Sequence, residues 1–247
     1  MRYYGASDIG LVRKMNQDSY LIATNEKGDV FAIVCDGIGG GKSGDIASEM
    51  MTRYFGELFA KQKGFASQEE VENWLGSNLE KANDYLFTQS TTDKSLEGMG
   101  TTLVGALFCS QGIYVVNVGD SRAYVIQDNN EMKQITIDHN LAEDLFQKGE
   151  INQEDVAVHP KRNVLTNALG VVGSLKVDIF PLSKEIKRVL LCSDGLHGYV
   201  KEEEIKKLLT DSTSVQETVK KLIESANRAG GYDNITVIVV ELTGGKE

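Results

Sequence analysis

Four aspartates stand at the ends of the most apolar segments of the chain. Each lies within two residues of a run rich in Val, Ile, Leu or aromatic residues, and the four are Asp36, Asp120, Asp194 and Asp233. A single aspartate at a strand end is usually a turn residue. Carboxylates brought to about 4 Å repel by several kcal/mol, and a divalent cation relieves that repulsion. Because oxygen ligands favour Mg²⁺ or Mn²⁺, the pattern predicts a carboxylate-bridged magnesium or manganese site.

Zinc chemistry fits the sequence less well. The chain has three histidines, His139, His159 and His197, and none is paired at the spacing of a zinc site. Three cysteines cannot form a full disulfide framework, and each lies within an apolar run. We therefore expect buried, reduced thiols in a cytoplasmic protein.

The glycine-rich segment 37–44 permits two other interpretations. Its glycines match the GxGxxG spacing of dinucleotide-binding proteins, and Gly41-Lys42-Ser43 resembles the end of a nucleotide-binding P-loop. Both interpretations require a parallel sheet. Asp36 also occupies the position of the first P-loop glycine, where its charge would oppose nucleotide phosphates. We expect instead that the glycines let the backbone pack beside a metal, with the Gly37 carbonyl as a ligand.

The strand and helix patterns alternate along the chain. Apolar runs bounded by Gly, Asp or Asn predict strands at 30–35, 102–109, 113–118, 123–127, 188–192 and 235–242. Amphipathic spacing predicts helices at 45–62, from residue 67 onward, at 202–209 and at 214–228. Ser67 and Ser214 are each followed three residues later by Glu, which predicts capping boxes.

The lengths of the connections decide the sheet type. Four strand candidates between residues 101 and 136 are joined by the short links 110–112, 119–121 and 128–131, which predicts an antiparallel meander. Several strands are apolar at every position, which indicates burial on both faces. We predict the α+β class, a four-layer α-β-β-α sandwich with two central antiparallel β-sheets. A parallel α/β sheet also gives apolar runs and stays as the alternative.

Composition narrows the class of protein. The 247 residues carry a formal net charge of −10, which argues against binding to a nucleic-acid backbone. No apolar run approaches the roughly 20 residues that cross a bilayer, and no signal peptide is visible. We expect one domain over residues 1–247, a monomer that does not insert into membranes.

Motifs across almost the whole chain resemble one family. They are Asp8-Ile9-Gly10, Arg13 to Asp18, Val34 to Gly40, Gly98 to Thr102, Gly119 to Tyr124, Thr136 to His139, Arg162 to Thr166, Leu191 to Leu196 and Tyr232 to Val237. In this order they resemble the metal-dependent Ser/Thr protein phosphatases of the PP2C (PPM) family, in its compact bacterial form. Ile38 and Gly41 stand where other members carry a histidine.

The resemblance implies a role for each site residue. Asp36 bridges two Mn²⁺ or Mg²⁺ ions, the Gly37 carbonyl binds the second ion, and Asp194 and Asp233 complete the first. Asp18 holds water at the metals, Asp120 with Asp194 forms a weaker third site, and Arg13 holds the substrate phosphate. Residues 141–174, with 141–147 as a short helix, resemble the family's mobile flap.

The implied reaction is hydrolysis of phosphoserine and phosphothreonine monoesters in proteins by a metal-activated water. The implied partners are phosphoproteins, including a cognate Ser/Thr kinase that this enzyme reverses. Two alternatives stay open from the sequence. One is a P-loop-like nucleotide hydrolase, and the other is a pseudophosphatase that binds phosphoproteins without turnover.

Overall fold

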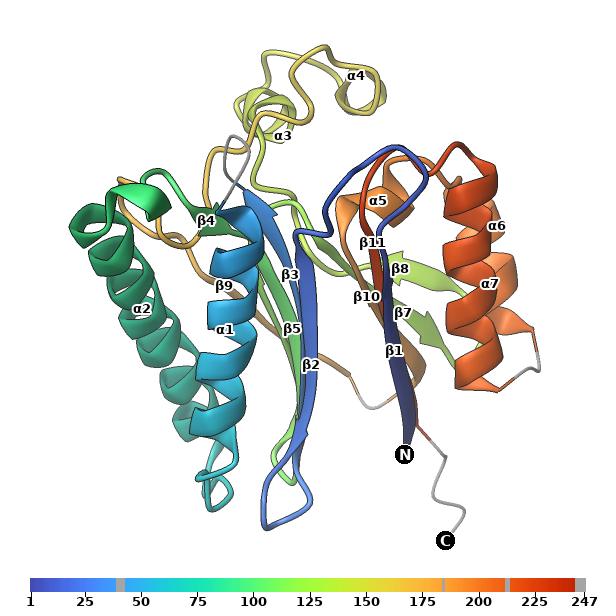
Figure 1. Cartoon of the computed structure of the whole chain (residues 1–247). Helices are drawn as coiled ribbons and strands as arrows, with labels where there is room; N and C mark the ends of the chain where they lie inside the picture. The colour runs from blue at the N-terminus through green and yellow to red at the C-terminus, as the bar shows by residue number, and fades with distance from the viewer. Residues whose placement is uncertain (39–42, 184, 212–213, 243–247) are drawn as a thin grey trace, which may run out of the picture.

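Two antiparallel β-sheets lie face to face in the computed structural model, which describes residues 1–38, 43–183, 185–211 and 214–242 (Figure 1). Sheet A has the strand order β1-β11-β10-β7-β8, and sheet B has the order β2-β3-β5-β6-β9 with β4 paired to β3. The strands are β1 (Arg2–Asp8), β2 (Asp18–Thr24), β3 (Val30–Ile38), β4 (Gly100–Thr101), β5 (Leu103–Cys109), β6 (Gly112–Val118), β7 (Arg122–Gln127), β8 (Met132–Gln134), β9 (Asp178–Pro181), β10 (Ile186–Cys192) and β11 (Ile235–Glu241).

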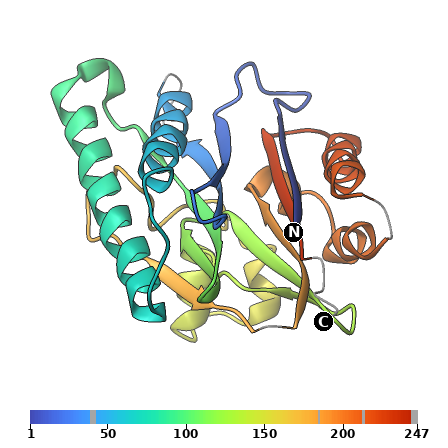
Figure 2. The ribbon, with the colours of Figure 1, turned by 90° about the horizontal axis from the view of Figure 1, so that it is seen from below.

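Helices cover the outer face of each sheet. In Figures 1 and 2, α1 and α2 lie against sheet B, while α6 and α7 lie against sheet A. The helices are α1 (Gly44–Phe59), α2 (Gln68–Thr92), α3 (Leu141–Gln147), α4 (Gln153–Val156), α5 (Asp194–His197), α6 (Glu202–Thr210) and α7 (Val215–Arg228), with a 3-10 turn η1 (Lys94–Leu96). This is the predicted α-β-β-α sandwich.

The continuous apolar runs are explained by burial on both faces of each sheet. In β3, Phe31 and Ile33 face the core shared with α1 and α2. Ala32 and Val34 face the core between the two sheets. A third core lies between sheet A and its helices. Every pairing between the described strands is antiparallel, so the parallel alternative is wrong.

The predicted capping boxes are confirmed in their serine half alone, because the Glu70 carboxylate accepts from the Ala66 N–H at 2.7 Å and not from Ser67. The Ser67 side chain accepts a hydrogen bond from the Glu70 N–H at 3.1 Å, and Ser214 accepts one from the Glu217 N–H at 3.2 Å. Each cap satisfies a backbone donor that has no partner within the first turn. Among the described helices, none is both long enough and apolar enough to span a membrane.

The predicted four-strand meander is wrong at its middle link. β5 pairs with β6, and β7 pairs with β8, as expected. The link 119–121 instead carries the chain from sheet B to sheet A, where β7 pairs with β10. Gly119 has φ +111° and lies so close to Thr102 that a Cβ would come within 2.6 Å of its Cγ2. A short link can therefore change sheets as well as reverse within one, because glycine allows a tight corner.

Residues 141–174 leave the sandwich at the top of Figure 1 and carry α3 and α4. The predicted helix at 141–147 is confirmed. The Leu141 N–H donates to the Val164 carbonyl at 2.9 Å, and the Thr166 N–H donates to the His139 carbonyl at 3.0 Å. These bonds hold the base of the segment, while most of its apolar side chains lie outside the three cores.

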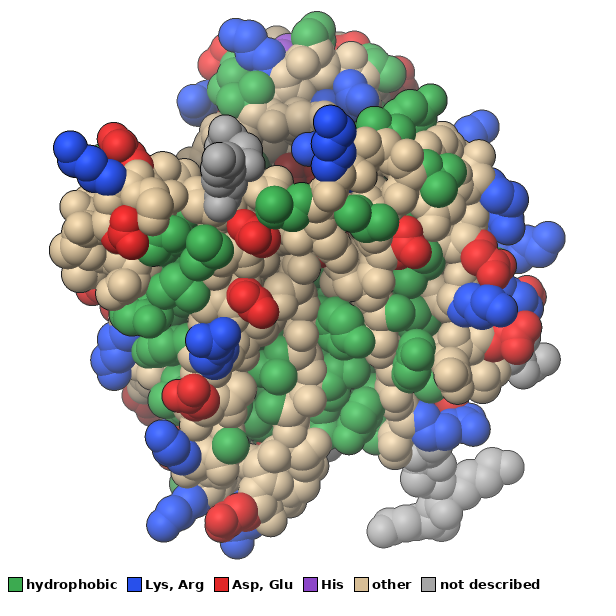
Figure 3. Space-filling view, in the orientation of Figure 1, with side chains coloured by type: hydrophobic (Ala, Val, Ile, Leu, Met, Phe, Trp, Pro, Cys, Tyr) green, Lys and Arg blue, Asp and Glu red, His purple; other side chains and the backbone are tan. Residues whose placement is uncertain are grey.

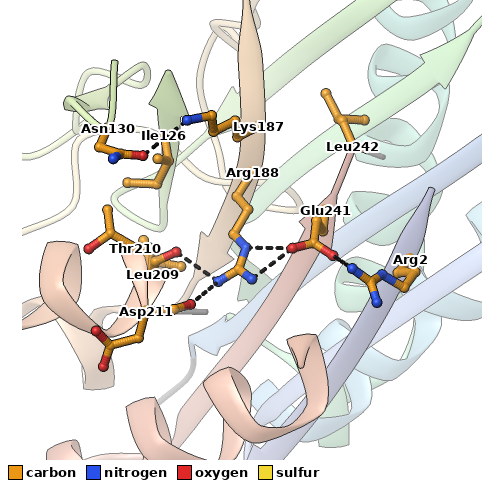
Figure 4. A pocket seen from close by; sticks show the side chains of 10 residues that line it. All are labelled: Arg2, Ile126, Asn130, Lys187, Arg188, Leu209, Thr210, Asp211, Glu241 and Leu242. Carbon is orange, nitrogen blue, oxygen red and sulfur yellow. Dashed lines mark hydrogen bonds and ion pairs between the residues drawn. The ribbon is translucent and has the colours of Figure 1, made fainter. Parts of the chain in front are cut away.

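A cavity of about 390 Å³ lies at the bottom of sheet A, away from the predicted aspartate site (Figure 4). The Arg188 guanidinium there donates to Glu241 Oε1 at 2.7 Å and to the Leu209 carbonyl at 2.7 Å. Burial alone raises the pKa of Glu241, but the hydrogen bond and charge of Arg188, followed by those of Arg2, hold it below its ordinary value. The polar groups of this cavity therefore stabilise the fold.

We expect Glu241→Gln to lower the free energy of unfolding by about 2–4 kcal/mol at neutral pH, because it leaves the buried Arg188 charge without its carboxylate. The carboxylate's contribution is present above pH 4.5, the ordinary pKa, and is lost as the pH falls through the lowered value. Urea denaturation measures both effects. Lys220→Ala is the control, because its pair with Glu224 at 3.8 Å is exposed and is worth under about 0.5 kcal/mol. Equal stabilities for Glu241→Gln and wild type would contradict this role.

Candidate active site

Asp36 and Asp18 lie opposite each other on neighbouring strands at the top of sheet B. They are direct partners in the β2–β3 register, and side chains of such a pair lie on the same face of the sheet. The Asp36 N–H donates to Thr102 Oγ1 at 3.0 Å, and its carbonyl accepts from Thr101 Oγ1 at 2.9 Å. Asp18 Oδ2 accepts from Ser193 Oγ at 2.7 Å, which links this pair to sheet A.

Asp194 follows β10 on sheet A and begins the short helix α5. The next residue must be glycine, because a Cβ on Gly195 would come within 1.9 Å of the Asn234 carbonyl oxygen. This close approach brings the end of β10 against the start of β11. The Asp194 backbone is thereby held beside Asp233, the last predicted ligand.

Asp233 forms an ion pair with Arg13, whose Nη2 lies 2.6 Å from Asp233 Oδ2. Asn234, the residue that follows Asp233, fixes the loop that carries Arg13. The Asn234 Nδ2 donates to the carbonyls of Ile9 at 2.9 Å and Met15 at 3.0 Å. The Asn234 Oδ1 accepts from the Gln17 N–H at 2.8 Å. One amide side chain thus places Arg13 at the carboxylates.

Asp120 lies in the corner where the chain crosses from sheet B to sheet A. Its carbonyl accepts a hydrogen bond from His197 Nε2 at 3.0 Å. Burial, followed by the Arg122 charge, lowers the pKa of His197 well below its ordinary value, so the imidazole is neutral. The adjacent Gly119 N–H donates to His139 Nδ1 at 3.0 Å. Two histidines therefore support this corner.

His139 also ties the corner to the base of segment 141–174. Its Nε2 lies 2.9 Å from Asp178 Oδ2, and Asn167 Nδ2 lies 2.8 Å from its Nδ1. Asn167 in turn pairs with Lys176 through hydrogen bonds of 2.9 and 3.1 Å with its backbone carbonyl and N–H. The two ends of the segment and the Asp120 corner thus share one network.

The carboxyl groups at this end of the sandwich perturb one another strongly. Burial, followed by the Asp18 and Asp194 charges, raises the pKa of Asp36 well above its ordinary value. Burial also dominates for Asp120, whose pKa is raised well above its ordinary value with a further contribution from the Asp194 charge. Burial raises the pKa of Asp18 to about 7, against hydrogen bonds from Ser193 and Thr236. Burial and the Asp233 charge raise the pKa of Asp194 to about 6.

The residues present fit a divalent cation. Asp194 Oδ1 is buried and has no hydrogen-bond partner among the described residues, and such an atom is normally paired. The surrounding donors are carboxylate oxygens, the ligands that Mg²⁺ and Mn²⁺ prefer. Among the described residues, no three His, Cys, Asp or Glu side chains are arranged around one metal position. Arg13 Nη2 is paired with one oxygen of Asp233.

Gly37 lies where a larger residue does not fit. A Cβ there would lie 2.0 Å from the Gly44 carbonyl oxygen, at the start of α1. Its N–H donates to the Gln17 carbonyl at 3.0 Å. The predicted tight packing of this glycine is confirmed, while its carbonyl's role as a ligand stays a prediction. The GxGxxG and P-loop motifs fall partly on residues 39–42, which lie outside the described residues.

A groove of about 400 Å³ leads to this centre. Asp120 and Asp194 lie at its inner end, and Tyr199, Lys201 and Arg162 belong to its walls. Arg122, also in the groove, donates to both oxygens of Asp138 at 2.8 Å. The groove gives an elongated ligand access to the carboxylates.

The predicted site residues from both sheets are thus brought to one end of the molecule. The roles of Asn234, His139 and His197 were not predicted, although Asn234 and His139 belong to motifs that carried the family resemblance. The position of Asn234 directly after the predicted ligand Asp233 was the available signal for its role. The contacts of His139 join residues far apart in the chain and leave no local pattern.

Comparisons with known proteins agree with this site. A family model described as Protein phosphatase 2C matches residues 12–234. The chain is 39% identical over 236 residues to the Serine/threonine phosphatase stp of Listeria welshimeri, covering 95% of this chain and 93% of that protein. It is 34% identical over 238 residues to the Protein phosphatase PhpP of Streptococcus pneumoniae, covering 96% and 95%.

Solved structures show the same fold. The Serine/threonine phosphatase Stp1 of Staphylococcus aureus superposes with a TM-score of 0.92 at 34% identity, covering 98% of this chain and 95% of that chain. The phosphatase PstP/Ppp of Mycobacterium tuberculosis gives a TM-score of 0.84 at 33% identity, covering 98% of this chain and 99% of that chain.

These matches and the acidic centre place the chain among the protein phosphatases. It belongs to the protein phosphatase 2C family and is a Ser/Thr phosphatase of this bacterial type. Membership implies a general dependence on divalent metal and phosphoprotein substrates. The nucleotide-hydrolase and pseudophosphatase alternatives receive no support.

Proposed function

We propose that this phosphatase holds two Mn²⁺ or Mg²⁺ ions at its acidic centre, together with a weaker third ion. Asp36 would hold both of the first two, the Gly37 carbonyl would contribute to one, and Asp194 and Asp233 would contribute to the other. The observation that carries the proposal is the buried, unpaired Oδ1 of Asp194 among carboxyl groups of raised pKa. When bound, the ions would activate water for attack on phosphorus at neutral pH.

The chain's own side chains orient the substrate and the water. The Arg13 guanidinium is half-exposed at the carboxylates and binds the phosphate oxygens, which neutralises charge as the reaction proceeds. Asp18 stands beside Asp36 and holds water in the centre. Asn234 fixes the Arg13 loop through three hydrogen bonds. Binding of phosphate at Arg13 competes with its ion pair to Asp233.

The proposed substrates are phosphoserine and phosphothreonine proteins, including a cognate Ser/Thr kinase that this enzyme counteracts. The relative named Serine/threonine phosphatase stp supports phosphoserine and phosphothreonine as the residues that are dephosphorylated. We further propose that the chain acts as a cytoplasmic monomer with one domain over residues 1–247. Segment 141–174 is its mobile flap, because few of its side chains are buried and its base is held mainly by hydrogen bonds.

The Asp36→Asn variant tests the metal centre with two measurements. Hydrolysis of a phosphothreonine peptide, which in the wild type requires Mn²⁺ or Mg²⁺ and stops with chelator, is lost in the variant. Thermal melting of the metal-free variant shifts upward, because one buried charge is removed from the repelling carboxylates. A gain of about 1 kcal/mol corresponds to roughly 2–4 °C. Near-wild-type turnover in this variant would contradict the proposed role of Asp36 as a ligand of both ions.

Arg13→Ala tests the phosphate contact. A charge-assisted hydrogen bond is worth roughly 1.5–3 kcal/mol, so we expect kcat/KM for a phosphopeptide to fall about ten- to hundredfold. Lys14→Ala is the matched control, since Lys14 is the adjacent cation and is exposed. Steady-state kinetics of Arg13→Ala and Lys14→Ala measure kcat/KM for the phosphopeptide in each variant. Equal losses of kcat/KM in the two variants would contradict a specific contact between Arg13 and the phosphate, because either positive charge of the loop would then have the same effect.

Asp120→Ala tests the third ion. A site with fewer carboxylates binds a hard cation more weakly, so calorimetric titration of the variant retains the two tight ions and loses the weak one. Hydrolysis of a phosphoprotein falls more than hydrolysis of a small activated ester, because a seryl or threonyl leaving group needs a proton. Ile38 and Gly41 supply no histidine for this proton. An identical loss of hydrolysis for both substrates would contradict the proposed role of this site in protonating the leaving group.

A further inference from the structure

Two tyrosines lie exposed beside Arg13. Tyr199 follows α5, and Tyr232 immediately precedes Asp233. Their ring centroids are 5.5 Å apart with the planes tilted by 39°, yet the residues remain 38% and 54% exposed. Arg13 Nε donates to the Tyr232 carbonyl at 3.4 Å. The aromatic pair therefore borders the guanidinium that we assign to the phosphate.

The backbone before Tyr232 is shaped to receive its ring. Gly230 and Gly231 have φ values of +127° and +52°. A Cβ on Gly230 would lie only 2.1 Å from Tyr232 Cε2. Glycine at position 230 lets the ring lie against the backbone, although more than half of Tyr232 is exposed. A tyrosine side chain has few rotatable bonds and therefore loses little conformational entropy on binding.

Aliphatic side chains extend this surface. Leu11 is 70% exposed, and its N–H donates to the Gly231 carbonyl at 2.8 Å. Its Cγ lies so near Gly231 that a Cβ there would approach to 2.8 Å. Val12 is 58% exposed on the same loop. Figure 3 shows hydrophobic side chains exposed in the upper part of the view, below segment 141–174 and near the loop between β1 and β2. Exposed apolar side chains that gather in one region are typical of a binding site.

The charges around the tyrosines select the kind of side chain that can bind. Asp194, Asp233, Arg13 and Arg162 all act electrostatically on the Tyr199 hydroxyl. The two aspartates belong to the proposed metal centre, where cations neutralise them. The remaining groups are arginines, and Arg162 makes no side-chain ion pair among the described residues. The arginine charges disfavour a cationic side chain, and the exposed faces of the two paired rings suit an apolar one.

We propose that Tyr199, Tyr232 and Leu11 form a docking surface for an apolar side chain of the protein substrate. That side chain belongs to a residue adjacent to the phosphorylated Ser or Thr. The adjacency follows because Arg13 holds the phosphate beside the rings and one extended residue spans only about 3.3–3.6 Å. The inference rests on the proposed function of this site. It makes the enzyme selective for phosphorylation sites flanked by Leu, Ile or Phe.

Matched phosphothreonine peptides test the selectivity. They share one sequence and differ only at the positions directly before and after phosphothreonine, which carry Leu or Phe, Gly, or Lys. Burying a large apolar side chain against the rings removes apolar surface from water, which favours binding. We expect wild-type kcat/KM for the Leu and Phe peptides to exceed that for the Gly peptide by about tenfold, mainly through KM, with Lys at or below Gly.

Variants assign the selectivity to the rings. Tyr199→Ala and Tyr232→Ala reduce the Leu-to-Gly ratio toward one, whereas Tyr199→Phe and Tyr232→Phe retain it, because the apolar face and not the hydroxyl makes the contact. Tyr85→Ala is the matched control. Tyr85 is 42% exposed and stacks on Tyr54 with centroids 6.0 Å apart, but lies on α2. Its variant keeps the wild-type ratio. Thermal melting verifies that each variant is folded.

The outcomes separate this inference from the proposed function. Equal wild-type kcat/KM for the Leu, Phe and Gly peptides overturns the docking surface while leaving the phosphatase intact. A preference for Lys overturns it as well. An alanine variant that keeps the wild-type ratio removes that tyrosine from the surface. Absence of metal-dependent hydrolysis of every peptide by the wild type contradicts the proposed function itself.

Discussion

Mutual repulsion among buried carboxyl groups is the constraint on which this structure depends. Asp36 and Asp18 face each other across two strands, and the Asp194 and Asp120 charges act on the same group. Such a cluster is destabilising unless protons or cations neutralise it. The fold tolerates it because three cores of apolar side chains hold the strands on which these groups stand. The apolar cores thus compensate for the destabilising carboxyl groups of a centre that suits cations.

The two-sheet architecture supplies carboxylates from independent elements. Sheet B contributes Asp36, and sheet A contributes Asp194 and Asp233, whose strand ends are locked together by the contact of Gly195 with Asn234. The corner at Gly119 carries Asp120 between the sheets. A single sheet would place these groups in one row. Two stacked sheets surround a common point, as a bridged pair of ions requires.

Much of this arrangement could be predicted because its causes are local. The apolar run of β3, the serine caps of α2 and α7, and the aspartates at the ends of several buried strands are readable from neighbouring residues. β1 and β2 were not predicted, since both contain partly exposed residues and no long apolar run. The link 119–121 was wrongly assigned to a turn within one sheet. Its short length excludes a parallel crossover, but it does not show whether the next strand joins the same sheet or the other one. The supports from Asn234 and His139 depend on contacts across more than a hundred residues or between separate loops.

The centre and its rim differ in what holds them in place. Asp18 and Asp36 are held by hydrogen bonds from Ser193 and Thr102 and by strand pairing, so a change at any of them disturbs several partners. Tyr199 and Tyr232 contact mainly each other and the backbone beneath them. Replacing an exposed ring leaves the carboxylates and their supports in position. The proposed selection of substrates at the rim can therefore vary independently of the chemistry at the centre, because the two rings take no part in the hydrogen bonds that hold Asp18 and Asp36.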